Sequence, residues 1–275
     1  MMFSGEPKVD CHLHVFDPER FPYQADSFYK PAAQEKASPA QLNFLMDAYG
    51  VRHALLVQPN SGYNEDNRCL LDTIARSQGR LKGMAVVANT VSRSELEALK
   101  AQGIVGVAIN PALYGTEHYT GIGQLLERLA DLDLIAQVQV KEDQLLDLLP
   151  MLKASGCRLV FDHCGRPDIN AGIGQAGFQA LLELGRGGRS CVKLSGYAKF
   201  SQKSFPYDDV WPYVAELASA FTLDACVWAS DWPFLRAPER IDYGVLLSLV
   251  NTLFPVEEDR RKLMWETPRV WFGFE

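Results

Sequence analysis

Two histidines near the start of the chain are the first residues that could do chemistry. His12 and His14 lie two residues apart in the apolar run Val9-Asp10-Cys11-His12-Leu13-His14-Val15-Phe16. Side chains of a β-strand alternate between its faces, so both imidazoles are expected on one face, with Asp10 below them. Burying two imidazoles toward one point is costly unless water, a metal ion or a substrate meets them there. The run therefore predicts a functional site, and the alternative is a pair of incidental histidines on an edge strand.

Further polar side chains stand where later apolar runs end. His163 ends one run, and Asp231 ends another directly before Trp232-Pro233. Asp231 is either a turn cap or a carboxylate that accepts a proton from water. Asp162 is expected to face outward, because its neighbour His163 points inward. The ends of the remaining runs add Gln58, Ser61, Asn110, Lys193 and Ser195.

Two cations near these ends have two interpretations each. Arg166, three residues past His163, is either a surface residue of a turn or a clamp for a substrate carboxylate. Lys193 either contributes to catalysis or substrate binding, or forms an ion pair with Asp10 lower in the fold, and we favour the ion pair.

Eight apolar runs alternate with helical segments along the chain. This alternation indicates parallel strands joined by right-handed crossovers, and continuous apolar runs are typical of strands buried on both faces. Ser38-Pro39 and the pair Ser92 and Glu95 are helix-start signals. The expected strands are 8–15, 52–58, 82–88, 104–110, 134–140, 158–163, 190–195 and 226–231. The expected helices follow Pro39 and cover 66–78, 92–102, 118–131, 142–155, 175–186, 207–221 and the C-terminal part.

We therefore predict an α/β fold, a single (β/α)₈ barrel domain over residues 1–275, in which chemistry lies at the carboxyl ends of the strands. A doubly wound open sheet is the alternative, but no Gly-x-Gly-x-x-Gly follows the first run.

Composition excludes several classes of partner. The chain has 275 residues, 47% of them hydrophobic, and a net charge of −7 without a basic run, which argues against nucleic acid and anionic membranes. No apolar stretch reaches the length of a membrane span. The six cysteines are scattered without a Cys-x-x-Cys pair, as expected of free thiols in a reducing compartment. A cytoplasmic protein is expected.

Together, Asp10-x-His12-x-His14, the strand ending in His163 and Asp231-Trp232-Pro233 resemble the amidohydrolase superfamily (amidohydrolase-2 type). The resemblance spans the chain and is greatest to the lactonase branch, which includes 2-pyrone-4,6-dicarboxylate lactonase and sugar lactonases. It implies that Asp231 is the general base that activates water. It also implies that His12, His14 and His163 surround a lactone carbonyl and stabilise the oxyanion, which is the chemistry that hydrolysis of an ester requires. The implied substrate-binding residues are Arg166, Tyr29 and Gln58, and we add Ser61, Asn110 and Lys193.

The chain departs from this pattern in two respects. Runs 104–110 and 134–140 carry neither a bridging lysine or carboxylate nor a histidine, so a binuclear metal site is not expected. Ala108 stands where the dicarboxylate lactonase has an arginine, which favours another acidic or sugar-derived lactone as substrate. We expect a metal-independent lactonase acting on a small lactone or organic acid. One alternative is a lactonase or decarboxylase that holds one Zn²⁺ on His12, His14, His163 and Asp231. Another is a non-catalytic barrel that binds a small acid.

Overall fold

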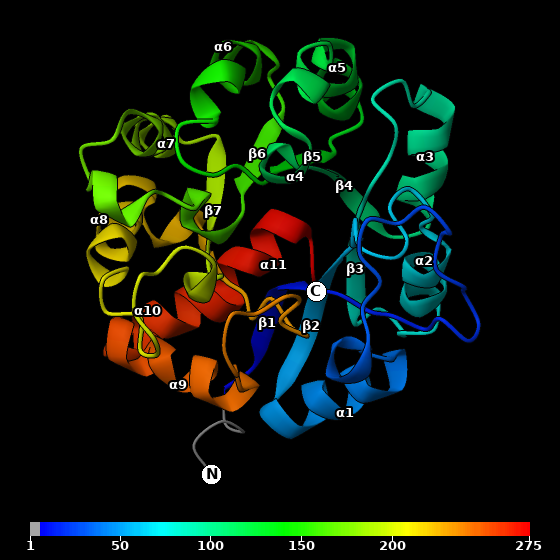
Figure 1. The fold of residues 1–275 in the computed structure, drawn as a ribbon, viewed down its shortest axis with the longest axis horizontal. Helices are drawn as coiled ribbons and strands as arrows, with labels where there is room; N and C mark the ends of the chain where they lie inside the picture. Colours follow the sequence, from blue (N-terminus) through cyan, green and yellow to red (C-terminus); the bar gives the residue numbers. More distant parts are fainter. Residues whose placement is uncertain (1–5) are drawn as a thin grey trace.

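The computed structural model describes residues 6–275, whose strands form a ring surrounded by helices (Figure 1). Eight parallel strands pair in sequence order, so the predicted (β/α)₈ barrel is confirmed. All eight predicted runs form strands, each ending one to three residues earlier than expected. The strands are β1 (Lys8–Leu13), β2 (Val51–Val57), β3 (Leu81–Ala85), β4 (Ile104–Ile109), β5 (Ile135–Val138), β6 (Arg158–Phe161), β7 (Ser190–Leu194) and β8 (Cys226–Trp228).

Two of the helices begin at the capping signals found in the sequence. Ser38 accepts a hydrogen bond from the Gln41 amide, and Ser92 and Glu95 form the expected reciprocal cap. None of the helices within residues 6–275 combines the length and the hydrophobicity needed to cross a bilayer. The helices are α1 (Pro39–Tyr49), α2 (Arg68–Ala75), α3 (Arg93–Ala101), α4 (Pro111–Tyr114), α5 (Gly123–Asp131), α6 (Leu145–Ala154), α7 (Ala176–Arg186), α8 (Trp211–Phe221), α9 (Tyr243–Leu253), α10 (Glu257–Arg261) and α11 (Thr267–Phe272).

The ring closes between β1 and the segment that follows β8. The amide of Asp231 donates to the carbonyl of His12 over 2.9 Å, and the amide of His14 donates to the carbonyl of Trp232 over 2.9 Å. Leu13 and Trp232 form a parallel bridge between these two bonds. The closing contact therefore lies at the carboxyl ends of the strands and joins the segments that carry His12, His14 and Asp231.

An irregularity in β1 turns Asp10 away from the histidines. The pairing of β1 with β2 shifts register between Asp10 and Leu13, so the alternation of side chains is interrupted there. The Asp10 carboxylate accepts hydrogen bonds from the Tyr243 hydroxyl of α9 (2.9 Å) and the Ser230 amide (3.0 Å). The expectation that Asp10 shares a face with His12 and His14 is therefore wrong.

The C-terminus closes the other end of the barrel. In Figure 1 the C-terminus lies at the centre of the ring, reached through α11. Phe272 and Phe274 are buried in the interior cluster. The strands contribute Val9, Cys11, Leu55, Val57, Met84, Ile135, Val160, Cys191, Val227 and Ala229 to this cluster. The barrel interior is therefore apolar at this end, and polar groups collect at the opposite mouth.

Replacing Phe272 with alanine tests this packing. Phe272→Ala is expected to lower the free energy of unfolding by about 3–5 kcal/mol, because it leaves a cavity at the closed end. Val270 in the same helix is 81% exposed, so Val270→Ala should change it by less than about 0.5 kcal/mol. Denaturant unfolding measures both variants, and equal losses would contradict this account of how α11 packs.

Candidate active site

Four buried side chains converge at the carboxyl mouth of the barrel. The Oδ1 atom of Asp231 lies 3.7 Å from Nε2 of His12, 3.8 Å from Nε2 of His14 and 3.6 Å from Nε2 of His163. The two strand-1 histidines come from β1 and the residue just after it, and the other two side chains follow β6 and β8. The structure thus brings together the four residues singled out in the sequence, around one carboxylate oxygen.

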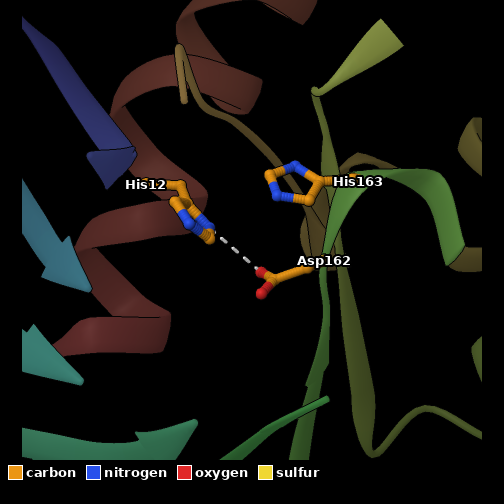
Figure 2. A group of neighbouring side chains, drawn as sticks. All are labelled: His12, Asp162 and His163. Carbon is orange, nitrogen blue, oxygen red and sulfur yellow. Dashed lines mark hydrogen bonds and ion pairs between the residues drawn. The ribbon is translucent and has the colours of Figure 1, made fainter. Parts of the chain in front are cut away.

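Asp162 lies inside the barrel and not against the helices, so that expectation is wrong. Figure 2 shows Asp162 and His163 both pointing toward His12, and Asp162 Oδ1 lies 3.2 Å from His12 Nδ1. β6 ends at Phe161, and His163 has a φ of +51°, which breaks the alternation of a strand. The turn after Phe161 therefore brings two successive side chains to the interior.

Lys193 is completely buried beneath the histidines and pairs with Asp162, not with Asp10. Its Nζ lies 3.0 Å from Asp162 Oδ1 and donates to Gln137 Oε1 over 2.6 Å. The register shift in β1 turns Asp10 toward α9, outside the barrel. Lys193 and Asp10 therefore cannot form an ion pair. Lys193 does not line the cavity above the imidazoles, so the structure does not support its expected contact with substrate.

Burial lowers the pKa of His12, His14 and His163, so all three are neutral at neutral pH. His14 Nδ1 lies 2.7 Å from the carbonyl oxygen of Val57, which can only accept a hydrogen bond. His14 therefore carries its proton on Nδ1 and presents a lone pair from Nε2 toward Asp231. His163 Nδ1 lies 3.0 Å from the Ser195 hydroxyl.

Sequence reasoning missed Lys199, whose Nζ lies 2.8 Å from Asp231 Oδ2. Burial would raise the pKa of Asp231, but the positive charge of Lys199 opposes burial, and that pKa lies below its usual range. Asp231 is therefore a carboxylate at neutral pH. Lys199 belongs to the turn after β7, and loops at this end of a barrel are where functional residues gather. The position of Lys199 shortly after a predicted strand was the sequence signal that could have identified it.

A cavity of about 250 Å³ opens above the imidazoles. Gln58, Ser61, Asn110 and Arg166, which are expected to bind substrate, line it. It shares residues with a neighbouring cavity of about 520 Å³ on the β7–β8 side. The shared residues are Arg166, Lys199, Asp231, Leu235 and Arg236. Three cations and one carboxylate therefore stand where the two cavities meet.

Local hydrogen bonds already hold two of the predicted binding residues. The Gln58 side-chain amide donates to the carbonyls of Asn64 and Asp66, and its Oε1 is buried without a partner among the described residues. Asn110 caps α4 and donates to the Asn60 side chain. Both side chains shape the cavity wall. Gln58 Oε1 still has its capacity to accept a hydrogen bond.

Tyr29 does not line the cavity, contrary to expectation, and Phe28 does. The Tyr29 hydroxyl donates to Glu35, which raises the pKa of Tyr29. The other oxygen of Glu35 accepts from the Arg236 amide over 2.7 Å. Glu35 thus ties the loop after β1 to the loop after β8, and this local bond decides where Tyr29 points.

Comparison with known proteins agrees with this geometry. The model of the amidohydrolase family matches residues 9–274. The chain belongs to the amidohydrolase family. It is 32% identical to a 4-sulfomuconolactone hydrolase of Rhizobium radiobacter, over 96% of this chain and 89% of the relative. It is 29% identical to a 2-pyrone-4,6-dicarboxylate hydrolase of Comamonas testosteroni, over 94% and 88%.

Among solved structures, an Acinetobacter baumannii protein superimposes with a TM-score of 0.85 and 28% identity, covering 97% of this chain and 99% of that one. It is described as a "probable 2-pyrone-4,6-dicarboxylic acid hydrolase" with citric acid bound. The expected resemblance to amidohydrolases, in their lactonase branch, is confirmed.

Part of the donor set of this amidohydrolase could hold a single metal ion, because ligand atoms of His12, His14 and Asp231 lie within 4.8 Å of one another. Tetrahedral Zn²⁺ with bonds of about 2.0–2.1 Å sets its ligand atoms roughly 3.3–3.4 Å apart. The separations of 3.6–3.8 Å between Asp231 Oδ1 and the three Nε2 atoms are close to that value. Imidazole nitrogens and a carboxylate oxygen also match the preferences of zinc.

Gly196 controls the position of His163 and can be tested with a matched variant. A Cβ at Gly196 would lie 2.6 Å from the His163 ring, whereas one at Gly188 meets nothing within 4 Å. Both glycines have positive φ, so each alanine substitution should cost about 1–2 kcal/mol of stability. Crystal structures of both variants should show the His163 ring displaced from Asp231 only in Gly196→Ala. An unmoved ring in that variant would contradict the assignment.

Proposed function

We propose that this amidohydrolase hydrolyses a lactone that carries an acidic group, through attack of a water molecule activated by Asp231. The observation that carries the proposal is the convergence of three neutral imidazoles on the ionised carboxylate of Asp231 at a cavity. The relatives named above are hydrolases of a sulfomuconolactone and of a pyrone dicarboxylate, which supports a cyclic ester as substrate.

Opening a lactone needs a proton acceptor for the water and hydrogen-bond donors for the carbonyl oxygen. Asp231 accepts the proton of the attacking water. The lone pair of His14 Nε2 faces the same point and binds the second hydrogen of that water. The carbonyl carbon then lies between this water and the side of the site formed by His12 and His163. The proton held by Asp231 finally passes to the alkoxide that leaves when the ring opens.

The cations at the junction of the cavities favour an acidic substrate. Arg166 Nε is buried without a hydrogen-bond partner among residues 6–275, and its guanidinium remains charged although burial lowers its pKa. Lys199 and Arg236 stand beside it. A substrate carboxylate that binds Lys199 would weaken the pair between Lys199 and Asp231 and so make Asp231 a stronger base. Ala108 lines the cavity and offers no charge for a second carboxylate.

The reaction we propose does not require a metal. The ammonium groups of Lys199 and Lys193 lie against Asp231 and His12 and oppose a further cation there. If one zinc ion is bound, His12, His14, His163 and Asp231 would hold it, and it would supply Lewis-acid polarisation of the carbonyl.

Asp231→Asn is the direct test of the proposed base. Against a panel of acidic and sugar-derived lactones, we expect kcat to fall by about 10²–10⁴-fold with little change in KM. Asp224→Asn is the matched control, because Asp224 is exposed at the opposite end of β8. No hydrolysis of any lactone by the unmodified protein, with ligand binding unaffected by Asp231→Asn, would favour a non-catalytic binding barrel.

Metal content tests the second part of the proposal. Protein purified without added zinc is expected to contain far less than one equivalent of metal and to keep its activity after dialysis against a chelator. Elemental analysis and the hydrolysis assay measure this. Tightly bound metal near one equivalent, with activity lost on its removal, would show that the zinc alternative is correct.

A further inference from the structure

We propose that Lys193 is a positioning residue that holds His12 as the tautomer protonated on Nε2, opposite to the tautomer of His14. His12 then directs an N–H into the cavity while His14 directs a lone pair into it. The hydrogen-bond network beneath the imidazoles leads to this assignment.

The Lys193 ammonium has three N–H donors, and the described residues offer three acceptors around it. Gln137 Oε1 lies at 2.6 Å, Asp162 Oδ1 at 3.0 Å and His12 Nδ1 at 3.2 Å. Lys193 is fully buried, so a donor that found no acceptor would stay unpaired in the protein interior. All three are satisfied only when His12 Nδ1 accepts.

Asp162 does not need a proton from His12. Its Oδ1 forms an ion pair with Lys193 Nζ over 3.0 Å, and its Oδ2 accepts from Gln137 Nε2 over 2.8 Å. The Gln137 amide is oriented by its neighbours, because its oxygen faces an ammonium and its nitrogen faces a carboxylate. In the other tautomer, an Nδ1–H of His12 would donate to Asp162 but would confront a Lys193 N–H at the same time. The count of donors therefore selects the Nε2–H form of His12.

The two strand-1 histidines thereby have opposite polarity. His14 donates from Nδ1 to the Val57 carbonyl and presents a lone pair. His12 accepts at Nδ1 from Lys193 and presents an N–H suited to the oxygen of the reacting carbonyl. This catalytic role rests on the proposed function, whereas the tautomers do not. The same network disfavours ligation of zinc by His12, because a metal requires the Nε2 lone pair.

Nuclear magnetic resonance of protein labelled with ¹⁵N-histidine tests the tautomers without any substrate. We expect His12 to show a protonated Nε2 and His14 a protonated Nδ1, with the signals assigned from His12→Gln and His14→Gln variants. A protonated Nδ1 on His12 in the unmodified protein would overturn the proposal. This measurement needs no variant of Lys193, so it decides the question even if such a variant fails to fold.

Lys193→Met tests the cause. Without the ammonium of Lys193, His12 should shift its proton to Nδ1 and donate a hydrogen bond to Asp162. The affinity for zinc, measured by competition with a chromophoric chelator, should then rise about tenfold or more. The kcat for lactone hydrolysis should fall about 10–100-fold at nearly constant KM. Lys153→Met, at an exposed lysine, is the control and should change neither. An unchanged His12 tautomer or unchanged zinc affinity in Lys193→Met would contradict the proposal. If no lactone is hydrolysed at all, the proposed function fails, while the tautomer and zinc measurements still decide the role of Lys193.

Discussion

The backbone contact that closes the barrel is the constraint on which the site depends. Two hydrogen bonds of 2.9 Å join the residues His12 and His14 to Asp231 and Trp232, which lie about 220 positions later in the chain. Because neighbouring parallel strands present side chains to the same mouth, this pairing brings two imidazoles and a carboxylate together. The register shift in β1 adds the second condition, since it lets both histidines face inward while Asp10 binds α9 through Tyr243.

A layer of buried polar groups separates the carboxyl mouth of the barrel from the apolar interior. Lys193, Asp162 and Gln137 are each no more than 1% exposed, and every charge among them has a partner. Apolar side chains of similar size often stabilise a fold as well as a buried ion pair does, so stability alone does not account for this layer. Its hydrogen bonds reach His12, and fixing that ring is a function apolar side chains could not perform.

The electrostatics of the mouth differ from those of the molecule. The chain carries a net charge of −7, yet Lys199, Arg166 and Arg236 gather beside Asp231 at the junction of two cavities. A local positive field in a cleft attracts anions even when the whole protein is acidic. The bonds of Glu35 to Tyr29 and Arg236 hold two loops together near this junction. The positive charges, the contact between the two loops and the ionised carboxylate of Asp231 therefore all occur at the junction of the two cavities.

The sequence by itself determined the barrel and the main members of its site. Burial of parallel strands on both faces leaves apolar runs that are visible locally, and the polar residues His163 and Asp231 stand out at their ends. Only the tertiary structure decided that Asp162 faces inward, that Lys193 pairs with it, and that Lys199 reaches Asp231. Those outcomes depend on a bulge, on a left-handed turn at His163 and on loop positions. Such features arise from contacts between residues far apart in the chain. A local pattern of residue types does not indicate which distant residues will pair.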